Sequence, residues 1–200
     1  MYYLIQTVAI AVSRLLLACL VSALVPIIAH GQWRDNSEVD ACAEQLEQRT
    51  AALLARDWLQ LEILAKRYLH TCSGVVGSEK LADAHWSIAV AKLEAGQYPE
   101  SLRASDDCIQ VFNSNPGCHL AKTEALVGLK RLNEARAALE MTERLTEHLI
   151  ESAERDHSVA QGAGEEMYQA RLNEFRGLLR GAEQIRMRYF YFAPTRSNNR

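Results

Sequence analysis

The sequence has few residues that interrupt helices: only four prolines occur in 200 residues, at Pro26, Pro99, Pro116 and Pro194. Convincing runs of alternating apolar and polar residues, the pattern of a half-buried strand, are also missing. Apolar residues instead recur with helical spacing through almost all of the chain beyond residue 31. These absences disfavour a sheet-rich fold, and the spacing predicts an all-α protein.

The sequence also lacks a strong excess of either charge, since its formal net charge is -3 and 24% of its residues are charged. Such totals do not favour a nucleic-acid partner. The charges are nevertheless unevenly placed. Residues 171–200 contain seven arginines against two glutamates, a net of +5, whereas residues 32–170 carry 14 bases against 23 acids, a net of -9. An acidic body therefore ends in a basic segment.

Recognisable catalytic motifs are missing as well. The chain has no Gly-x-Ser-x-Gly elbow, no phosphate-binding glycine loop and no His-Glu-x-x-His helix. Adjacent carboxylates such as Asp106-Asp107 and Glu165-Glu166 diverge around a helix and are typical of solvated charge. We therefore predict that the protein is not an enzyme and needs no cofactor or metal, with an enzyme of unfamiliar site as the remaining alternative.

The first 31 residues resemble a secretory signal peptide. Arg14 precedes an apolar run from Leu15 to Ala29, and Ala29-His30-Gly31 supplies small residues before a predicted cleavage at Gln32. The stretch before Arg14 is also apolar, so residues 2–29 could instead remain as a membrane anchor. Cleavage predicts a periplasmic or secreted protein, and retention predicts a membrane-anchored one.

A third possibility for the leader is lipidation, because Leu16-Leu17-Ala18-Cys19 resembles a bacterial lipoprotein signal with Cys19 as the acylated residue. Only four residues separate Arg14 from Cys19, however, which is too short for a hydrophobic core of export length. Cleavage before Gln32 remains the favoured prediction.

Turn signals divide the body into a row of helices joined by short connections. Pro99 suits the first turn of a helix, and Pro116 after Asn113-Ser114-Asn115 marks a break between two helices. Short connections force neighbouring helices to run antiparallel, so the chain is predicted to form successive hairpins. The expected helices cover residues 37–55, 57–72, 78–95, 98–113, 117–130, 132–158 and 164–190.

A shift of 34 residues aligns the chain with itself. It places Gly96-Gln97-Tyr98 on Lys130-Arg131-Leu132 and His85 on His119, which favours a structural role for the two histidines over a catalytic one. Arg56-Asp57-Trp58 forms a looser upstream copy. Self-similarity at this period predicts a repeat protein.

The segment from Ala95 to Ser101 resembles the inter-helix turn of a tetratricopeptide repeat, and Leu132-Asn133-Glu134-Ala135 resembles its next copy. The resemblance spans Asp40 to Leu145. It departs from the family at the missing Trp-x-x-Leu-Gly opening and at Pro116, which comes three residues late.

The resemblance implies a solenoid of hairpins whose inner wall binds a protein or peptide partner. After each turn the family packs a large apolar residue between paired helices, here Trp58, Tyr98 and Leu132, and a small one follows. Trp86 is the sharpest binding candidate, although it could instead fill the gap between hairpins. By resemblance, the wall includes Leu46, Thr50, Asp83, Trp86, Val90, Leu120 and Glu124.

Four cysteines remain after removal of the leader, namely Cys42, Cys72, Cys108 and Cys118. The first two lie at the same end of a predicted hairpin, and the last two bracket the Pro116 turn. We therefore hypothesise disulfides joining Cys42 to Cys72 and Cys108 to Cys118, as expected in an oxidising compartment. Four buried thiols are the alternative. A metal site using His70 and His119 with the cysteines lacks Cys-x-x-Cys spacing and is disfavoured.

The last predicted helix is amphipathic. Tyr168, Leu172, Phe175, Leu179 and Ala182 form one apolar stripe, as a helix capping the repeats requires. Gly162-Ala163-Gly164 would provide the bend that returns it. The following basic and aromatic segment has two interpretations: it could lie on anionic lipid or an acidic partner, or fold back on the acidic body. That segment comprises Arg180, Arg186, Arg188 and Tyr189-Phe190-Tyr191-Phe192.

The predicted organisation is therefore a signal peptide at 1–31, helical repeats at 32–160, a capping helix at 161–192 and a disordered tail at 193–200. The predicted function is an exported scaffold that binds a protein or peptide through its concave face. A membrane-anchored assembly factor that keeps residues 2–29 is the main alternative.

Overall fold

The computed structural model describes residues 36–159 and 165–191. The predicted leader, the Gly162-Ala163-Gly164 bend and the tail at 193–200 lie outside these ranges. The chain divides into two compact units, residues 1–39 and 40–200, and the described part of the first is only the opening turn of one helix. Within the described ranges, no helix has the length and apolar character needed to cross a membrane.

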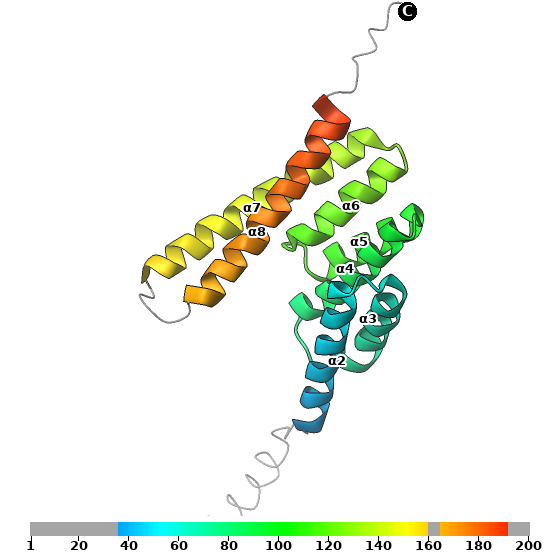
Figure 1. Cartoon of the computed structure of the whole chain (residues 1–200), viewed down its shortest axis with the longest axis vertical. Helices are drawn as coiled ribbons and strands as arrows, with labels where there is room; N and C mark the ends of the chain where they lie inside the picture. The colour runs from blue at the N-terminus through cyan, green and yellow to red at the C-terminus, as the bar shows by residue number, and fades with distance from the viewer. Residues whose placement is uncertain (1–35, 160–164, 192–200) are drawn as a thin grey trace, which may run out of the picture. The chain divides into compact units, whose positions relative to one another are not determined.

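The described part of residues 40–200 is all-α, as the sequence predicts. It contains seven α-helices, and the first six end within two residues of the predicted bounds (Figure 1). The seventh becomes π-helical after Ile185, a change that the apolar spacing does not indicate. The helices are α2 (Asn36–Leu54), α3 (Trp58–Cys72), α4 (Ser78–Glu94), α5 (Tyr98–Val111), α6 (Pro116–Gly128), α7 (Leu132–Val159) and α8 (Glu165–Ile185), followed by η1 (Arg186–Tyr191).

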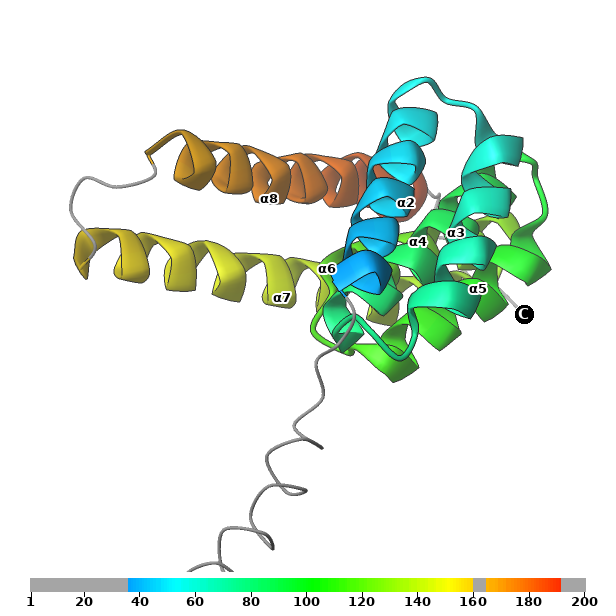
Figure 2. The same ribbon diagram turned by 90° about the horizontal axis from the view of Figure 1, so that it is seen from below.

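Successive helices pack on one another in antiparallel pairs. From α3 onward each helix contacts the next, and α4 also packs against α6, its counterpart in the following hairpin. The long helices α7 and α8 run side by side, as Figure 2 shows, and α8 reaches back to contact α6. This order of contacts is that of a helix-hairpin array.

One turn conformation recurs at the end of α2, α4 and α6. Arg56, Gly96 and Lys130 have positive φ angles of 54°, 69° and 60°. In each turn the following residue donates its N–H to the carbonyl five residues earlier, at 2.8–2.9 Å. This is the hydrogen bond of a Schellman motif, which satisfies a carbonyl at the helix end. The turn at Arg56 is only a loose match in sequence. It nevertheless has the same backbone conformation as the turns at Gly96 and Lys130.

The position three residues after each helix start is enclosed, although its residue is small only at Ser101 and Ala135. Leu61, Ser101 and Ala135 occupy it, and all three are fully buried. The hydroxyl of Ser101 donates to the carbonyl of Ala89 in the preceding helix at 2.9 Å, so its polar group is satisfied at this contact. The helix starts themselves are less enclosed, since Tyr98 is 37% exposed.

Two disulfides lie at the opposite ends of these helices. Cys42 is bonded to Cys72 and Cys108 to Cys118, with Cα–Cα distances of 5.8 and 5.9 Å, and these are the pairs expected from the hairpin geometry. All four cysteines are buried, and the second bridge packs against Ala82 of α4. Two structural disulfides indicate an oxidising extracellular or periplasmic compartment.

The C-terminal segment folds back on the array as far as it is described. Leu172, Phe175 and Ala182 of the α8 stripe are buried. In η1, Phe190 packs against a buried cluster from α6 and α7, and the guanidinium of Arg136 lies 5.3 Å from its ring centroid. Arg186 also hydrogen-bonds Glu143 of α7. These contacts favour the interpretation in which this segment covers the body; Phe192 lies outside the described residues.

Candidate functional site

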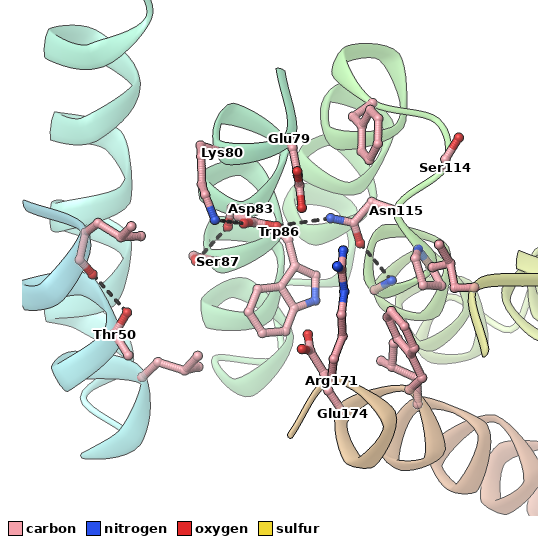
Figure 3. A pocket seen from close by; sticks show the side chains of 18 of the residues that line it. Thr50, Glu79, Lys80, Asp83, Trp86, Ser87, Ser114, Asn115, Arg171 and Glu174 are labelled. Carbon is pink, nitrogen blue, oxygen red and sulfur yellow. Dashed lines mark hydrogen bonds and ion pairs between the residues drawn. The ribbon is translucent and has the colours of Figure 1, made fainter. Parts of the chain in front are cut away.

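A groove of about 640 Å³ lies between the array and α8. Figure 3 shows α2 on one side, α4 at its centre, the start of α6 opposite, and α8 below. We call it the Trp86 groove after the indole at its centre. Its apolar lining includes Leu46, Leu53, Trp86, Phe112, Phe175 and Leu178, and its charged lining comprises Arg49, Glu79, Lys80, Asp83, Arg171 and Glu174.

The structure brings together four of the seven predicted wall residues. Leu46 and Thr50 of α2 and Asp83 and Trp86 of α4 all line the Trp86 groove. They come from two consecutive hairpins, so the packing of α2 beside α4 creates the surface.

The other three predicted residues lie elsewhere. Glu124 lines a second cavity of about 460 Å³ with Glu94 and Tyr98. Val90 and Leu120 are half-buried, and a Cβ built on Gly181 of α8 would lie 3.5 Å from Leu120. At Leu120, therefore, α8 covers the wall that the sequence predicts to be open.

Trp86 lies between the hairpins and also lines the groove. It packs against two buried clusters between the hairpins, one that includes Cys108 and Cys118 and one that includes Ala104 and Ala121. It is only half-buried, however, and it also faces the groove. Gly117 permits this position, because a Cβ added there would lie 3.2 Å from the indole nitrogen. The groove therefore contains a large, partly exposed aromatic side chain.

Asp83 lies one helical turn before Trp86 and is held in place by its neighbours. Its Oδ1 accepts a hydrogen bond from the side-chain amide of Asn115 at 3.2 Å, and its Oδ2 lies 3.9 Å from the ammonium of Lys80. Asn115 is fixed in turn, because its own Oδ1 caps α6 by accepting from the N–H of Gly117 at 2.9 Å. Desolvation by burial raises the pKa of Asp83, despite the nearby cations.

Arg49 also lines the groove, although no pattern in the sequence indicates it. Its side chain is only 5% exposed, and its guanidinium lies 5.0 Å from the ring centroid of Tyr68. Within the described part of the chain, Arg49 Nη1 is buried and has no hydrogen-bond partner. Burial also lowers the pKa of Arg49, since desolvation disfavours the charged form. Nothing in the sequence distinguishes Arg49 from the solvent-facing arginines of other amphipathic helices.

The fourth side of the groove is contributed by α8. Arg171 and Glu174 point from α8 toward the groove in Figure 3, and Phe175 and Leu178 add apolar surface. The sequence predicts Phe175 as part of a capping stripe but not as part of a binding surface. The three acidic and three basic residues of the lining balance, so the groove has no formal preference for a ligand of either charge.

The repeated histidines are not in the groove. His119 is buried at the start of α6, where its Nε2 lies 3.0 Å from the carbonyl oxygen of Asn113. Burial lowers the pKa of His119, and it also lowers the pKa of His85. Each histidine therefore occupies a structural position in its own hairpin.

Metal binding receives no support from the described residues. Among them, no group of three or more His, Cys, Asp or Glu side chains is placed to hold an ion. Cys72 and Cys118, neighbours of His70 and His119, are bonded to other cysteines and present no thiolate.

Comparison with known proteins adds no family. Neither a protein-family model nor a curated protein matches the chain. The groove and the repeated turns are therefore the features of the chain that bear on its function.

Proposed function

We propose that this protein is an exported helical-repeat scaffold that binds a protein or peptide partner in the Trp86 groove. The observation that carries the proposal is the partly exposed Trp86 indole, packed between two hairpins at the centre of a groove that five chain segments line. Rigid aromatic anchors in apolar pockets with a few polar groups are typical of recognition sites.

The shape of the groove favours a slender partner. An open solenoid wall could accept a broad surface, but here α8 lies across from α2 and α4 and narrows the space. An extended segment or a single helix fits between such walls more readily than a folded domain.

The relationship to tetratricopeptide repeats belongs to the same proposal. Three Schellman turns with equivalent buried positions support a repeat origin for the first three hairpins. We infer that these hairpins are degenerate tetratricopeptide-like repeats and that α8 serves as their cap.

The cellular setting follows from the disulfides and the leader together. The disulfides favour an oxidising compartment, and a leader cleaved before Gln32 would release the protein there. Amino-terminal sequencing of the mature protein separates this proposal from a tethered assembly factor. A chain that begins at Gln32 cannot be anchored through residues 2–29, whereas an intact amino terminus would favour the anchored form.

The groove can be tested by blocking it without disturbing the core. Thr50 is exposed on α2 and lines the groove, so Thr50→Arg would insert a long charged side chain at little cost in folding. Thr71→Arg is a matched control, because Thr71 is also exposed and makes the same hydroxyl bond to the carbonyl four residues earlier.

The readout is affinity capture from the compartment in which the protein resides. We expect the wild-type protein and Thr71→Arg to capture equal amounts of one partner. Thr50→Arg and Trp86→Ala should fail to capture it. Trp58→Ala controls for loss of a half-buried indole outside the groove. Equal capture by all variants would place the binding surface elsewhere.

A further inference from the structure

One side of α8 packs on α6 and α7, but another side carries a row of exposed residues. These residues recur three or four positions apart and continue from α8 into η1. Two of them have large hydrophobic side chains, since Met187 is 42% exposed and Tyr191 is 69% exposed. We call this set the outer row, and it comprises Arg176, Arg180, Glu183, Met187 and Tyr191.

The outer row and its flank carry an excess of positive charge. Of the four arginines from position 176 to position 188, only Arg186 forms an ion pair with a described residue, Glu143 of α7. The other three are exposed. Glu183 is the one acid in the same stretch of sequence, and it shares an open surface with Arg180 and Arg188. Three arginines against one glutamate leave positive charge for an anionic partner.

The outer row faces away from the Trp86 groove. Glu174 and Leu178 of α8 line that groove, and Arg176 and Arg180 each follow one of them by two positions. Two positions on an α-helix correspond to a rotation of about 200°. The groove and the outer row therefore lie on opposite sides of α8.

We propose that the outer row docks the protein on a membrane that contains anionic phospholipid. Arg176 and Arg180 bind headgroup phosphates, and Met187 and Tyr191 enter the interfacial layer. This inference goes beyond the proposed function and does not depend on it. A protein docked in this way holds the Trp86 groove on the side of α8 that faces away from the bilayer, where a partner can reach it.

The form of the outer row favours a lipid surface over an acidic protein. The row extends over about 20 Å of helix, and it lies on an open surface rather than around a pocket that could take a single side chain. A layer of headgroups offers phosphates along the whole row. Arginines next to exposed aromatic and aliphatic side chains are typical of helices that lie in the membrane interface. The sequence that follows adds Phe192, Arg196 and Arg200.

The uneven charge of the chain orients it at such a surface. Residues 171–200 carry a net charge of +5, whereas residues 32–170 carry a net charge of -9. An anionic membrane therefore attracts the α8 end and repels the rest of the body. The attraction acts over about 10 Å at 0.1 M salt, so binding should weaken as the salt concentration rises.

Vesicle co-sedimentation tests the proposal on the purified protein. The vesicles contain either phosphatidylglycerol mixed with phosphatidylcholine or phosphatidylcholine alone. We expect binding to the mixed vesicles and much weaker binding to phosphatidylcholine. All variants are prepared in the same processed form as the wild type, so a leader that remained attached would contribute equally to each.

Two pairs of substitutions with the same change in charge identify the surface. Arg176→Gln combined with Arg180→Gln should weaken binding to the mixed vesicles about 25-fold, at roughly fivefold for each arginine. Arg67→Gln combined with Arg103→Gln changes exposed residues of α3 and α5 and should leave binding nearly unchanged. Arg188 is kept, because it also lines the cavity that contains Glu94.

A third pair tests the hydrophobic contact. Met187→Ser combined with Tyr191→Ser should weaken binding to the mixed vesicles several-fold, because the side chains that enter the interface are lost. If a variant fails to fold, the comparison of the two lipid compositions with the wild-type protein still decides the question.

Equal binding to both kinds of vesicle would overturn the inference, and so would equal losses in the two arginine pairs. Absence of binding to phosphatidylglycerol would overturn it as well. Binding of poly-glutamate that depends on Arg176 and Arg180 would then assign the outer row to an acidic protein. Capture of a partner by the Trp86 groove is measured separately, so failure of the membrane contact leaves the proposed function standing.

Discussion

Different interactions hold the helices together at the two ends of the array. At the turn end, three connections share one left-handed residue and one hydrogen-bond pattern, at Arg56, Gly96 and Lys130. At the other end, the connections differ in length and sequence, and two disulfides join the helix ends there. The groove reaches this second end, because Asn115 at the start of α6 is part of its lining.

The turn end therefore repeats from hairpin to hairpin, whereas the disulfide end differs at each connection. Because backbone atoms make the hydrogen bonds of the turn, the same turn conformation can recur with different side chains. The disulfide end has distinct side chains at each connection, and it is there that Asn115 and Asp83 meet. Side chains at the disulfide end can thus vary while the turn end keeps the helices in register.

The largest expected effect comes from opening the disulfide end. Replacing Cys42 and Cys72 by alanine removes a bridge over 30 residues, and replacing Cys108 and Cys118 removes one over 10. Loop-closure entropy predicts losses in the free energy of unfolding of about 3.6 and about 2.7 kcal/mol, respectively. Urea denaturation of the two double variants measures both. A reversed order would show that native packing, rather than loop length, sets the contribution.

A clash at the turn end should have the next largest effect. A Cβ on Gly128 of α6 would lie 2.4 Å from the Tyr98 ring, so Gly128→Ala should destabilise the fold by about 1–3 kcal/mol. At Gly77 nothing lies within 4 Å of an added Cβ, and Gly77→Ala is the matched control. Thermal denaturation should show recovery when Tyr98→Ala is combined with Gly128→Ala. Without such recovery, the ring is not the cause.

Because the three turns share one conformation, adding a Cβ at the positive-φ position of one turn and removing it from the others should change stability in opposite directions. Gly96→Ala forces a Cβ into the left-handed region and should lower stability by about 1 kcal/mol. Arg56→Gly and Lys130→Gly relieve the same strain and should raise stability by up to about 1 kcal/mol. Arg56→Ala keeps a Cβ and serves as the control. Chemical denaturation curves of the four variants provide the comparison, and uniform destabilisation would contradict the shared conformation.

The smallest expected effect is a dependence of folding stability on pH, which arises at the disulfide end. Because burial lowers the pKa of His119 in the folded state, the unfolded chain binds the proton first as the pH falls through about 6.5. The contribution of His119 to the free energy of unfolding should therefore be complete above this pH and decline below it. His119→Gln should flatten the melting temperature between pH 8 and 5.5, whereas His70→Gln, at an exposed site, should not.

His85 contributes to this pH dependence with the same sign, since burial also lowers its pKa. Asp83 acts in the opposite sense at more acidic pH, because its raised pKa favours proton binding by the folded state. A melting temperature that rises from pH 8 to 5.5 would contradict the assignment to the histidines.

Local signals in the sequence were enough to predict the helices and the cysteine pairs. Pro99 and Pro116 lie at helix starts, and Asn115 caps α6 with its side chain. The disulfide pairs followed from hairpin geometry alone, since Cys42 and Cys72 must lie at the same end of antiparallel helices.

The groove depended on contacts that helical periodicity does not determine. An arginine in an amphipathic helix is usually solvated, and only Tyr68 and the neighbouring hairpin show that Arg49 is buried. The apolar stripe predicted that α8 would pack on the body, but not which helices it would face. As a result Arg171 joins the groove, while α8 lies against Leu120, which was predicted to line the wall.

The order of the bridges along the chain has a consequence for biogenesis. The first cysteine of the body joins the second and the third joins the fourth, so the two covalent loops neither overlap nor enclose one another. A polypeptide emerging amino-terminus first can close each loop as soon as its second thiol appears. Oxidation in that order would form both native bridges without a non-native disulfide that has to be reshuffled.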